Sequence, residues 1–244
     1  MVYELYGLSD DEIKIVEGVW LKNVFLLAKI FENQKYMQDF CNGKLYMNSL
    51  AYFKDIEIIN DKPRYDSYEG IRCYWQPQQC ILELNGHKFN NLIAPITLYS
   101  HSNNYKNVFC MWSISSENDI LRGNIYIDEE NKKFGEYLVV ITSPKIFLER
   151  ITSALQNSGL SAQVGLVEYY DEKTHLSFEE NKEVFHKVSN FSYQQEYRIA
   201  VNTNIDNKPY ILNIGNLEDI SIILTIDEFN QNIALKSLEN WETD

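Results

Sequence analysis

The chain has 244 residues, of which 45% are hydrophobic and 14% aromatic, so it can pack one domain with appendages, and wholesale disorder is excluded. Its 22 basic and 35 acidic residues give a net charge of −13, which excludes gripping a nucleic-acid backbone by general electrostatics but not a single base held in a pocket. Four cysteines without CxxC spacing and an N-terminus unlike a signal peptide favour a cytoplasmic protein with reduced thiols.

Residues 1–20 predict a short helical appendage. Ser9 and Glu12 have capping-box spacing, and apolar residues follow them. The phrase "YGLSDDEIKIVE" resembles the C-terminal tail of restriction-modification methyltransferases, over these residues only. That resemblance implies that the gene arose next to a phage-defence locus or by fusion with part of one. An ordinary N-terminal helix is the alternative.

The chain then predicts alternating strands and short helices. A buried strand is expected from Asn23 through "NVFLLAKIF", then a helix stopped by Gly43, then a strand and helical turn over 44–57. The apolar run "VWLKNVFLLAKIF" contains two lysines and is too short to cross a bilayer. We therefore expect no membrane association.

Several short strands are expected between residues 70 and 113. Asn85-Gly86, set between "QCILEL" and "HKFNNLIA", is a hairpin signal because both residues tolerate positive φ. An almost wholly apolar strand follows at 107–115.

The clearest helix follows a strand at 136–142. It has Ser143 as N-cap, Pro144 at its first position and Gly159 as its stop. Its expected apolar face consists of Ile146, Phe147, Ile151 and Leu155.

Further strands and a last helix complete the pattern. The strand signals are at 164–170, 191–201, 208–214 and 220–226, and the helix is at 227–241. The sequence therefore predicts one α+β domain over residues 21–244, with a mixed or antiparallel central sheet and a few flanking helices.

The stretch "FSYQQEYRIAV" (191–201) carries the main candidate site. Residues two apart in a strand face the same side, so Gln194, Glu196 and Arg198 are expected to line one face. A solvated polar stripe is one interpretation. The apolar flanks favour a central strand instead, in which Arg198 keeps Glu196 ionised in a partly buried site.

The Gln-x-Glu pair resembles the third motif of ADP-ribosyltransferases. The resemblance implies an ADP-ribosyltransferase-like fold, NAD as substrate and Glu196 as the catalytic carboxylate. Gln194 would orient the acceptor, and Arg198 would tune Glu196 or contact a phosphate. The residues expected to hold NAD are Lys29 on the first strand, Tyr46, Asn48 and Ser49 on the second, and Phe53. Lys29 stands where that superfamily has His or Arg, and snorkelling to the surface is its alternative.

Most of residues 23–225 resemble an uncharacterised family of bacterial and phage-associated proteins, often found among abortive-infection genes. The resemblance lies in the order of short motifs along the chain. The matching positions are Tyr46, Asn48, Phe53, Glu57, Asp66, Glu69, Gly70, Ser113, Tyr169, Lys187, Glu196 and Arg198.

Together these features predict a defence toxin that transfers ADP-ribose from NAD to a nucleic-acid or protein acceptor and is restrained by an antitoxin or regulatory protein. A non-catalytic sensing or binding module is one alternative, in which Glu196 and Arg198 form an internal ion pair. A carboxylate-metal nuclease using Glu57, Asp66 and Glu69 with Glu196 is another. We assign no metal ligands and no oligomeric state.

Overall fold

The computed structural model describes residues 24–55, 65–115 and 125–235. They form one mixed α+β domain in which most strand pairs are antiparallel. The appendage at 1–20 and Glu57 lie outside the described residues. No helix in the described part is long and apolar enough to span a membrane.

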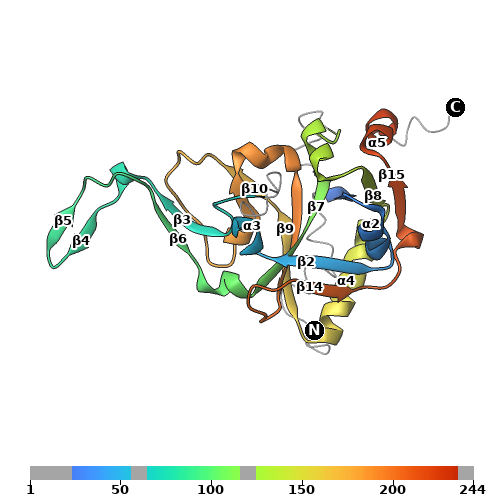
Figure 1. The fold of residues 1–244 in the computed structure, drawn as a ribbon, viewed down its shortest axis with the longest axis horizontal. Coiled ribbons are helices and arrows are strands. Elements are labelled where there is room, and N and C mark those ends of the chain that lie inside the picture. Colours follow the sequence, from blue (N-terminus) through green and yellow to red (C-terminus); the bar gives the residue numbers. More distant parts are fainter. Residues whose placement is uncertain (1–23, 56–64, 116–124, 236–244) are drawn as a thin grey trace, which may run out of the picture.

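The main sheet has eight strands, all paired in antiparallel fashion (Figure 1). Its order is β14-β2-β7-β1-β8-β15, and β13 lies between β7 and β9. The strands are β1 (Val24–Phe31), β2 (Lys44–Ser49), β7 (Lys106–Ser115), β8 (Tyr137–Ile141), β9 (Ser161–Leu166), β13 (Glu196–Asn202), β14 (Tyr210–Asn213) and β15 (Ser221–Leu224).

The sheet divides along one edge of β7. At one end of β7, Asn48 of β2 lies opposite Val108, and at the other end Ala28 of β1 lies opposite Trp112. Between these pairings the Lys29 Nζ donates to the Cys110 carbonyl oxygen at 2.5 Å. A side chain therefore satisfies a backbone acceptor at the point where two strands diverge.

Helices α2 (Gln34–Cys41) and α4 (Pro144–Ser158) cover one face of the sheet and enclose the largest apolar core. Phe147, Ile151 and Leu155 are buried there, as the helical pattern predicts, and Gly159 ends α4 in the left-handed conformation. The prediction for Ile146 is wrong, since it is 39% exposed.

The opposite face carries three kinds of cover. The first is α5 (Ile226–Asn232), whose Phe229 packs edge-on against Trp112. The described helix ends at Asn232, so the predicted helix over 227–241 is too long in its described part. The second is the short helix α3 (Tyr52–Asp55). The third is a set of small sheets formed by β3 (Ile71–Trp75), β6 (Ile96–Tyr99), β11 (Leu176–Ser177), β10 (Glu168–Tyr170) and β12 (His186–Val188).

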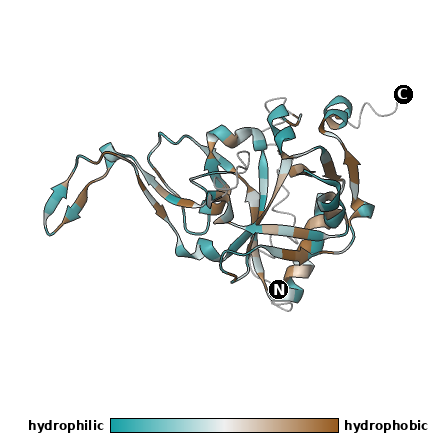
Figure 2. Cartoon of the chain, in the orientation of Figure 1, coloured by the Kyte–Doolittle hydropathy of each residue, from teal (hydrophilic) through white to brown (hydrophobic). Residues whose placement is uncertain are grey.

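A hairpin arm projects from the body of the domain (Figure 1). It consists of β4 (Leu82–Leu84) and β5 (His87–Phe89). Asn85 and Gly86 have φ angles of 51° and 80°, which confirms the predicted turn. Both hydrophobic and hydrophilic residues lie along it (Figure 2).

Short 3₁₀ turns connect many of these elements. They span Pro77–Gln79, His101–Tyr105, Glu129–Phe134, Glu183–Phe185, Ser189–Gln194 and Glu218–Ile220. The turn at Ser189–Gln194 replaces the first half of the strand expected over 191–201. The strand expected over 164–170 is likewise broken at Val167 into β9 and β10.

Candidate functional site

Glu196 and Arg198 lie on the same face of β13, as the alternation predicts. The Arg198 Nε donates to the Glu196 Oε2 at 2.8 Å. The prediction that Gln194 shares this strand face is wrong, because β13 begins only at Glu196. Gln195 before it has φ 41° and ψ 52°, a left-handed conformation that breaks the period of two.

Lys187 on β12 nevertheless brings Gln194 and Glu196 to one point. Its Nζ donates to the Gln194 Oε1 at 2.5 Å and to the Glu196 Oε1 at 2.6 Å. The same ammonium lies 4.7 Å from the centre of the Phe191 ring. Lys187, which lies on a separate strand, therefore brings together the two side chains that strand alternation was expected to place side by side.

Arg198 reaches across to Glu69, which lies just before β3. Its Nη1 and Nη2 donate to the two Glu69 oxygens at 2.6 and 2.9 Å, and Nη1 also donates to the Val184 carbonyl at 2.6 Å. This is the two-pronged geometry that a guanidinium favours with a carboxylate. The side chains of Arg198 and Glu69 are only 2% and 1% exposed, so the pair joins β13 to the covering layer in a dry environment.

The electrostatics of the site hold Glu196 ionised. Burial alone raises the pKa of Glu196, but the charges of Arg198 and Lys187, and hydrogen bonds from both, hold the pKa well below its usual range. The pKa of Lys187 is lowered by burial and raised by Glu196, with a net shift upward. The two cations therefore favour the ionised form of Glu196 at neutral pH.

Asp66 is the third carboxylate of the site. Its Oδ1 accepts a hydrogen bond from the Tyr68 backbone N–H at 2.9 Å, whereas its buried Oδ2 has no hydrogen-bond partner among the described residues. Burial, followed by the charge of Glu69, raises the pKa of Asp66 to about 6, while the charges of Lys187 and Arg198 act in the opposite direction. We call Asp66, Glu69, Lys187, Glu196 and Arg198 the charged cluster.

Two tyrosines border the charged cluster. The Tyr169 hydroxyl oxygen accepts a hydrogen bond from the Glu196 backbone N–H at 2.9 Å. The Tyr170 hydroxyl is buried and has no hydrogen-bond partner within the described part of the chain, and the charges of Asp66 and Glu69 act on it. Two buried polar atoms at the cluster, the Asp66 Oδ2 and the neighbouring Tyr170 hydroxyl, thus have no hydrogen-bond partner among the described residues.

The residue that sequence reasoning missed is Gln195. Its carbonyl oxygen accepts from the Ser113 N–H and hydroxyl, and its side-chain Oε1 accepts from the Trp112 indole at 2.8 Å. These bonds fix the turn that precedes Glu196. The positive φ at a glutamine has no sequence signal, so only the structure could show this role.

The residues expected to hold NAD have separate placements. Ser49 is buried and its hydroxyl accepts from the Tyr52 N–H, while Phe53 packs on the apolar cluster around Leu50 and Val108. Tyr46 is 55% exposed. Because Asn48 lies opposite Val108, which in turn lies opposite Ala200, alternation places Tyr46 and Asn48 on the same sheet face as Glu196 and Arg198.

Lys29 faces the opposite side of the sheet from Glu196, because Ala28 and Glu196 both lie opposite Trp112. Besides its bond to the Cys110 carbonyl, its Nζ lies 4.7 Å from the centre of the Phe109 ring. Burial, and then Glu196, raise the pKa of the Cys110 thiol to about 12, while Arg198 and Lys29 act to lower it. Lys29 and the charged cluster therefore act on the same thiol from different sides.

The geometry does not favour a metal site. No group of three or more metal-binding side chains occurs in the described ranges. The oxygens of Glu69 and Glu196 are taken by cationic side chains, and a divalent ion placed there would be repelled by Lys187 and Arg198.

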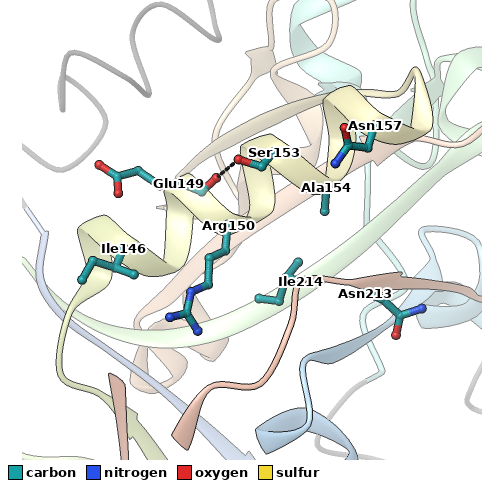
Figure 3. A pocket seen from close by; sticks show the side chains of 8 residues that line it. All are labelled: Ile146, Glu149, Arg150, Ser153, Ala154, Asn157, Asn213 and Ile214. Atoms are coloured by element: carbon teal, nitrogen blue, oxygen red, sulfur yellow. Dashed lines mark hydrogen bonds between the residues drawn. The ribbon is translucent and has the colours of Figure 1, made fainter. Parts of the chain in front are cut away.

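A shallow hollow lies on the other side of the sheet, along α4 (Figure 3). Its volume is about 310 Å³. Arg150, at its floor, is paired with Asp219 through two bonds of 3.0 and 2.5 Å, so its charge is already neutralised. The hollow is lined by Ile146, Glu149, Arg150, Ser153, Ala154, Asn157, Asn213 and Ile214, and it holds none of the predicted site residues.

No protein-family model matches the chain, and comparison with curated proteins and with solved structures finds no match either. The chemistry of the charged cluster is therefore inferred from its own residues. Those residues come from three separate segments of the chain: Asp66 and Glu69 lie before β3, Lys187 lies on β12, and Glu196 and Arg198 lie on β13.

Proposed function

We propose that the charged cluster is the working site of an ADP-ribosyltransferase-like enzyme, which transfers ADP-ribose from NAD to a nucleic-acid base or a protein as a toxin of bacterial phage defence. The observation that carries the proposal is that Glu196 is held in one position and in its ionised form. Two cations fix this carboxylate and hold its pKa well below its usual range. Breaking the bond between nicotinamide and ribose develops positive charge on the sugar, which a fixed carboxylate stabilises.

The charge balance of the cluster also supports this chemistry. Among the described residues the cluster holds three carboxylates and two cations, so it carries one excess negative charge once Asp66 ionises above a pH of about 6. Both the nicotinamide ring of NAD and the developing sugar cation are positive. An excess negative charge in a buried site favours them.

The residues present fit a polar sugar in part. Asp66 Oδ2 and the Tyr170 hydroxyl can bond to ribose hydroxyls, and Tyr46 and Asn48 lie on the same sheet face. The Glu196 side chain is 8% exposed, so the proposal requires part of the layer that covers Glu196 to move aside when NAD binds, while Lys187 and Arg198 keep their bonds to the carboxylate.

A second candidate function is a non-catalytic binding module, in which the cluster orders the fold. It is favoured by the pairing of Glu69, Lys187, Glu196 and Arg198, each of which has an oppositely charged partner and is nearly inaccessible. Removing one partner of such a group leaves a buried charge uncompensated.

The test compares wild-type protein with Glu196→Gln and Glu196→Asp. Labelled NAD and bacterial extract are incubated with each protein, growth is followed on expression, and melting temperatures are measured. If the protein is the proposed enzyme, the wild type transfers label and arrests growth, and both effects disappear in Glu196→Gln. Both fall steeply in Glu196→Asp, whose side chain keeps the charge but is one methylene shorter. Glu168→Gln, a change of an exposed carboxylate, is the matched control.

The binding module predicts the opposite combination. Wild-type protein would transfer no label, and Glu196→Gln would melt early, with Glu196→Asp between the two. That result would refute the transferase and leave Glu196 as a structural ion-pair residue.

A further inference from the structure

The hairpin arm is an amphipathic ribbon that the rest of the described chain leaves uncovered. In its register Leu82 lies opposite Phe89, Leu84 opposite His87, and Glu83 opposite Lys88. Since successive residues of a strand face opposite sides, one face carries Leu82, Leu84 and Phe89 together with His87, and the other carries the two charges. The leucine at the tip is 63% exposed.

The apolar surface continues beyond the two strands. Ile93, which follows β5, is fully exposed, and Ile81, which precedes β4, is 62% exposed, although alternation places Ile81 on the side of Glu83. A two-stranded hairpin alone is marginally stable in water, and contiguous exposed apolar side chains mark interaction sites in monomeric proteins. The arm stands away from the body (Figure 1), so the body does not cover this face.

The charges indicate what kind of surface covers it. Between Gln76 and Tyr99 the charged residues are Glu83 and Lys88, and they cancel, whereas the whole chain has a net charge of −13. A nucleic acid would require a basic arm. Two copies of an acidic protein repel each other over most of their surface, and the neutral arm is where that repulsion is weakest.

We infer that the arm is a self-association element, which packs its apolar face against the same face of a second copy. The face is self-complementary, because the same three apolar side chains can meet across a two-fold axis while Glu83 and Lys88 remain in water. Two-fold pairing of one patch with itself is the commonest symmetry of homodimers.

The size of the contact sets its strength. A specific interface buries at least about 1,000 Å² of total surface. The three apolar residues of the strand face cannot supply that area alone. Exposed apolar side chains beyond the two strands, such as Ile93, must therefore be covered too. A contact of this size gives a dimer that dissociates on dilution, rather than an obligate one.

The test is the mass of the purified full chain in solution, measured by sedimentation velocity over a wide range of concentration. We expect wild-type protein to approach twice the mass of one chain at high concentration and to fall toward one on dilution. Leu84→Glu should remain a monomer throughout. Glu83→Gln, which changes the polar face of the same strand, should associate like wild type.

A second variant controls for the case in which Leu84→Glu simply misfolds the arm. Replacing residues 77–94 by an Asn-Gly turn preserves β3 and β6, because Trp75 and Ile96 are already paired. It should be monomeric, with an unchanged melting temperature. Monomeric wild-type protein at every concentration, or a Leu84→Glu that associates normally, would refute the inference. Monomers that float with lipid vesicles would also refute it and assign the arm to a membrane surface.

Discussion

Replacing Asp66 by Asn is expected to stabilise the protein at neutral pH, which is unusual for a change at a buried polar residue. Burial and the charge of Glu69 raise the pKa of Asp66 from 3.8 to about 6. A carboxyl group whose pKa is higher in the folded state contributes full stability below its unfolded pKa. That stability declines as pH rises through the folded pKa. The difference between 3.8 and about 6 corresponds to about 3 kcal/mol.

Asn is nearly the same size as Asp, and its oxygen can keep the hydrogen bond from the Tyr68 N–H. Asp66→Asn should therefore gain up to about 3 kcal/mol in the free energy of unfolding at pH 8 and little at pH 4. The other charges that act on Asp66 are those of Glu69, Lys187 and Arg198.

Urea unfolding of wild type and Asp66→Asn at several values between pH 4 and pH 8 measures this difference. Asp171→Asn is the matched control, because the exposed Asp171 accepts the same kind of turn hydrogen bond, from the Lys173 N–H. A variant gain that does not grow between pH 5 and pH 7 would contradict the reasoning. So would an Asp66→Asn that is less stable at pH 8.

Two further substitutions probe the frame around the site. Arg198→Met should cost about 3–5 kcal/mol in urea unfolding, because the Glu69 carboxylate loses both its charged hydrogen bonds. Adding Glu69→Gln should recover part of this, and strictly additive costs would show that the pair does not act as a unit. Gly135→Ala should cost at least about 2 kcal/mol, since φ is 140° and a Cβ would lie 2.1 Å from the Phe31 carbonyl oxygen. Gly159→Ala, with φ 63° and open space, should cost only about 1 kcal/mol in the same urea unfolding.

The elements that could be predicted are those whose signal is local. The pattern of Asn85-Gly86 between apolar runs predicts the hairpin, and both residues have the expected positive φ. Pro144 and Gly159 bound α4 as predicted. The exposed Ile146 shows the limit, because the face a helix buries depends on the strand it packs against, and that strand is distant in sequence.

The candidate site divides in the same way. Alternation predicts the shared face of Glu196 and Arg198, since that depends on two adjacent positions. It fails for Gln194 because the left-handed Gln195 interrupts the strand, held there by Trp112 and Ser113 from β7. The contact between Arg198 and Glu69 spans 129 residues, and no local periodicity encodes such a pairing.

The position of Asp66 separates the two candidate functions more sharply than that of Glu196. A cluster that only ordered the fold would work best without the excess negative charge, and apolar residues could fill the same volume at lower cost. The chain instead keeps a third buried carboxylate whose Oδ2 has no partner among the described residues. If the cluster is structural, Asp66→Asn improves stability and changes nothing else. If it acts on the cationic end of NAD, the same variant becomes more stable while label transfer falls, and wild-type transfer falls as pH drops below about 6, where Asp66 takes up its proton. An Asp66→Asn variant that is more stable but transfers less label would identify the cluster as a site where a destabilising charge is kept for activity.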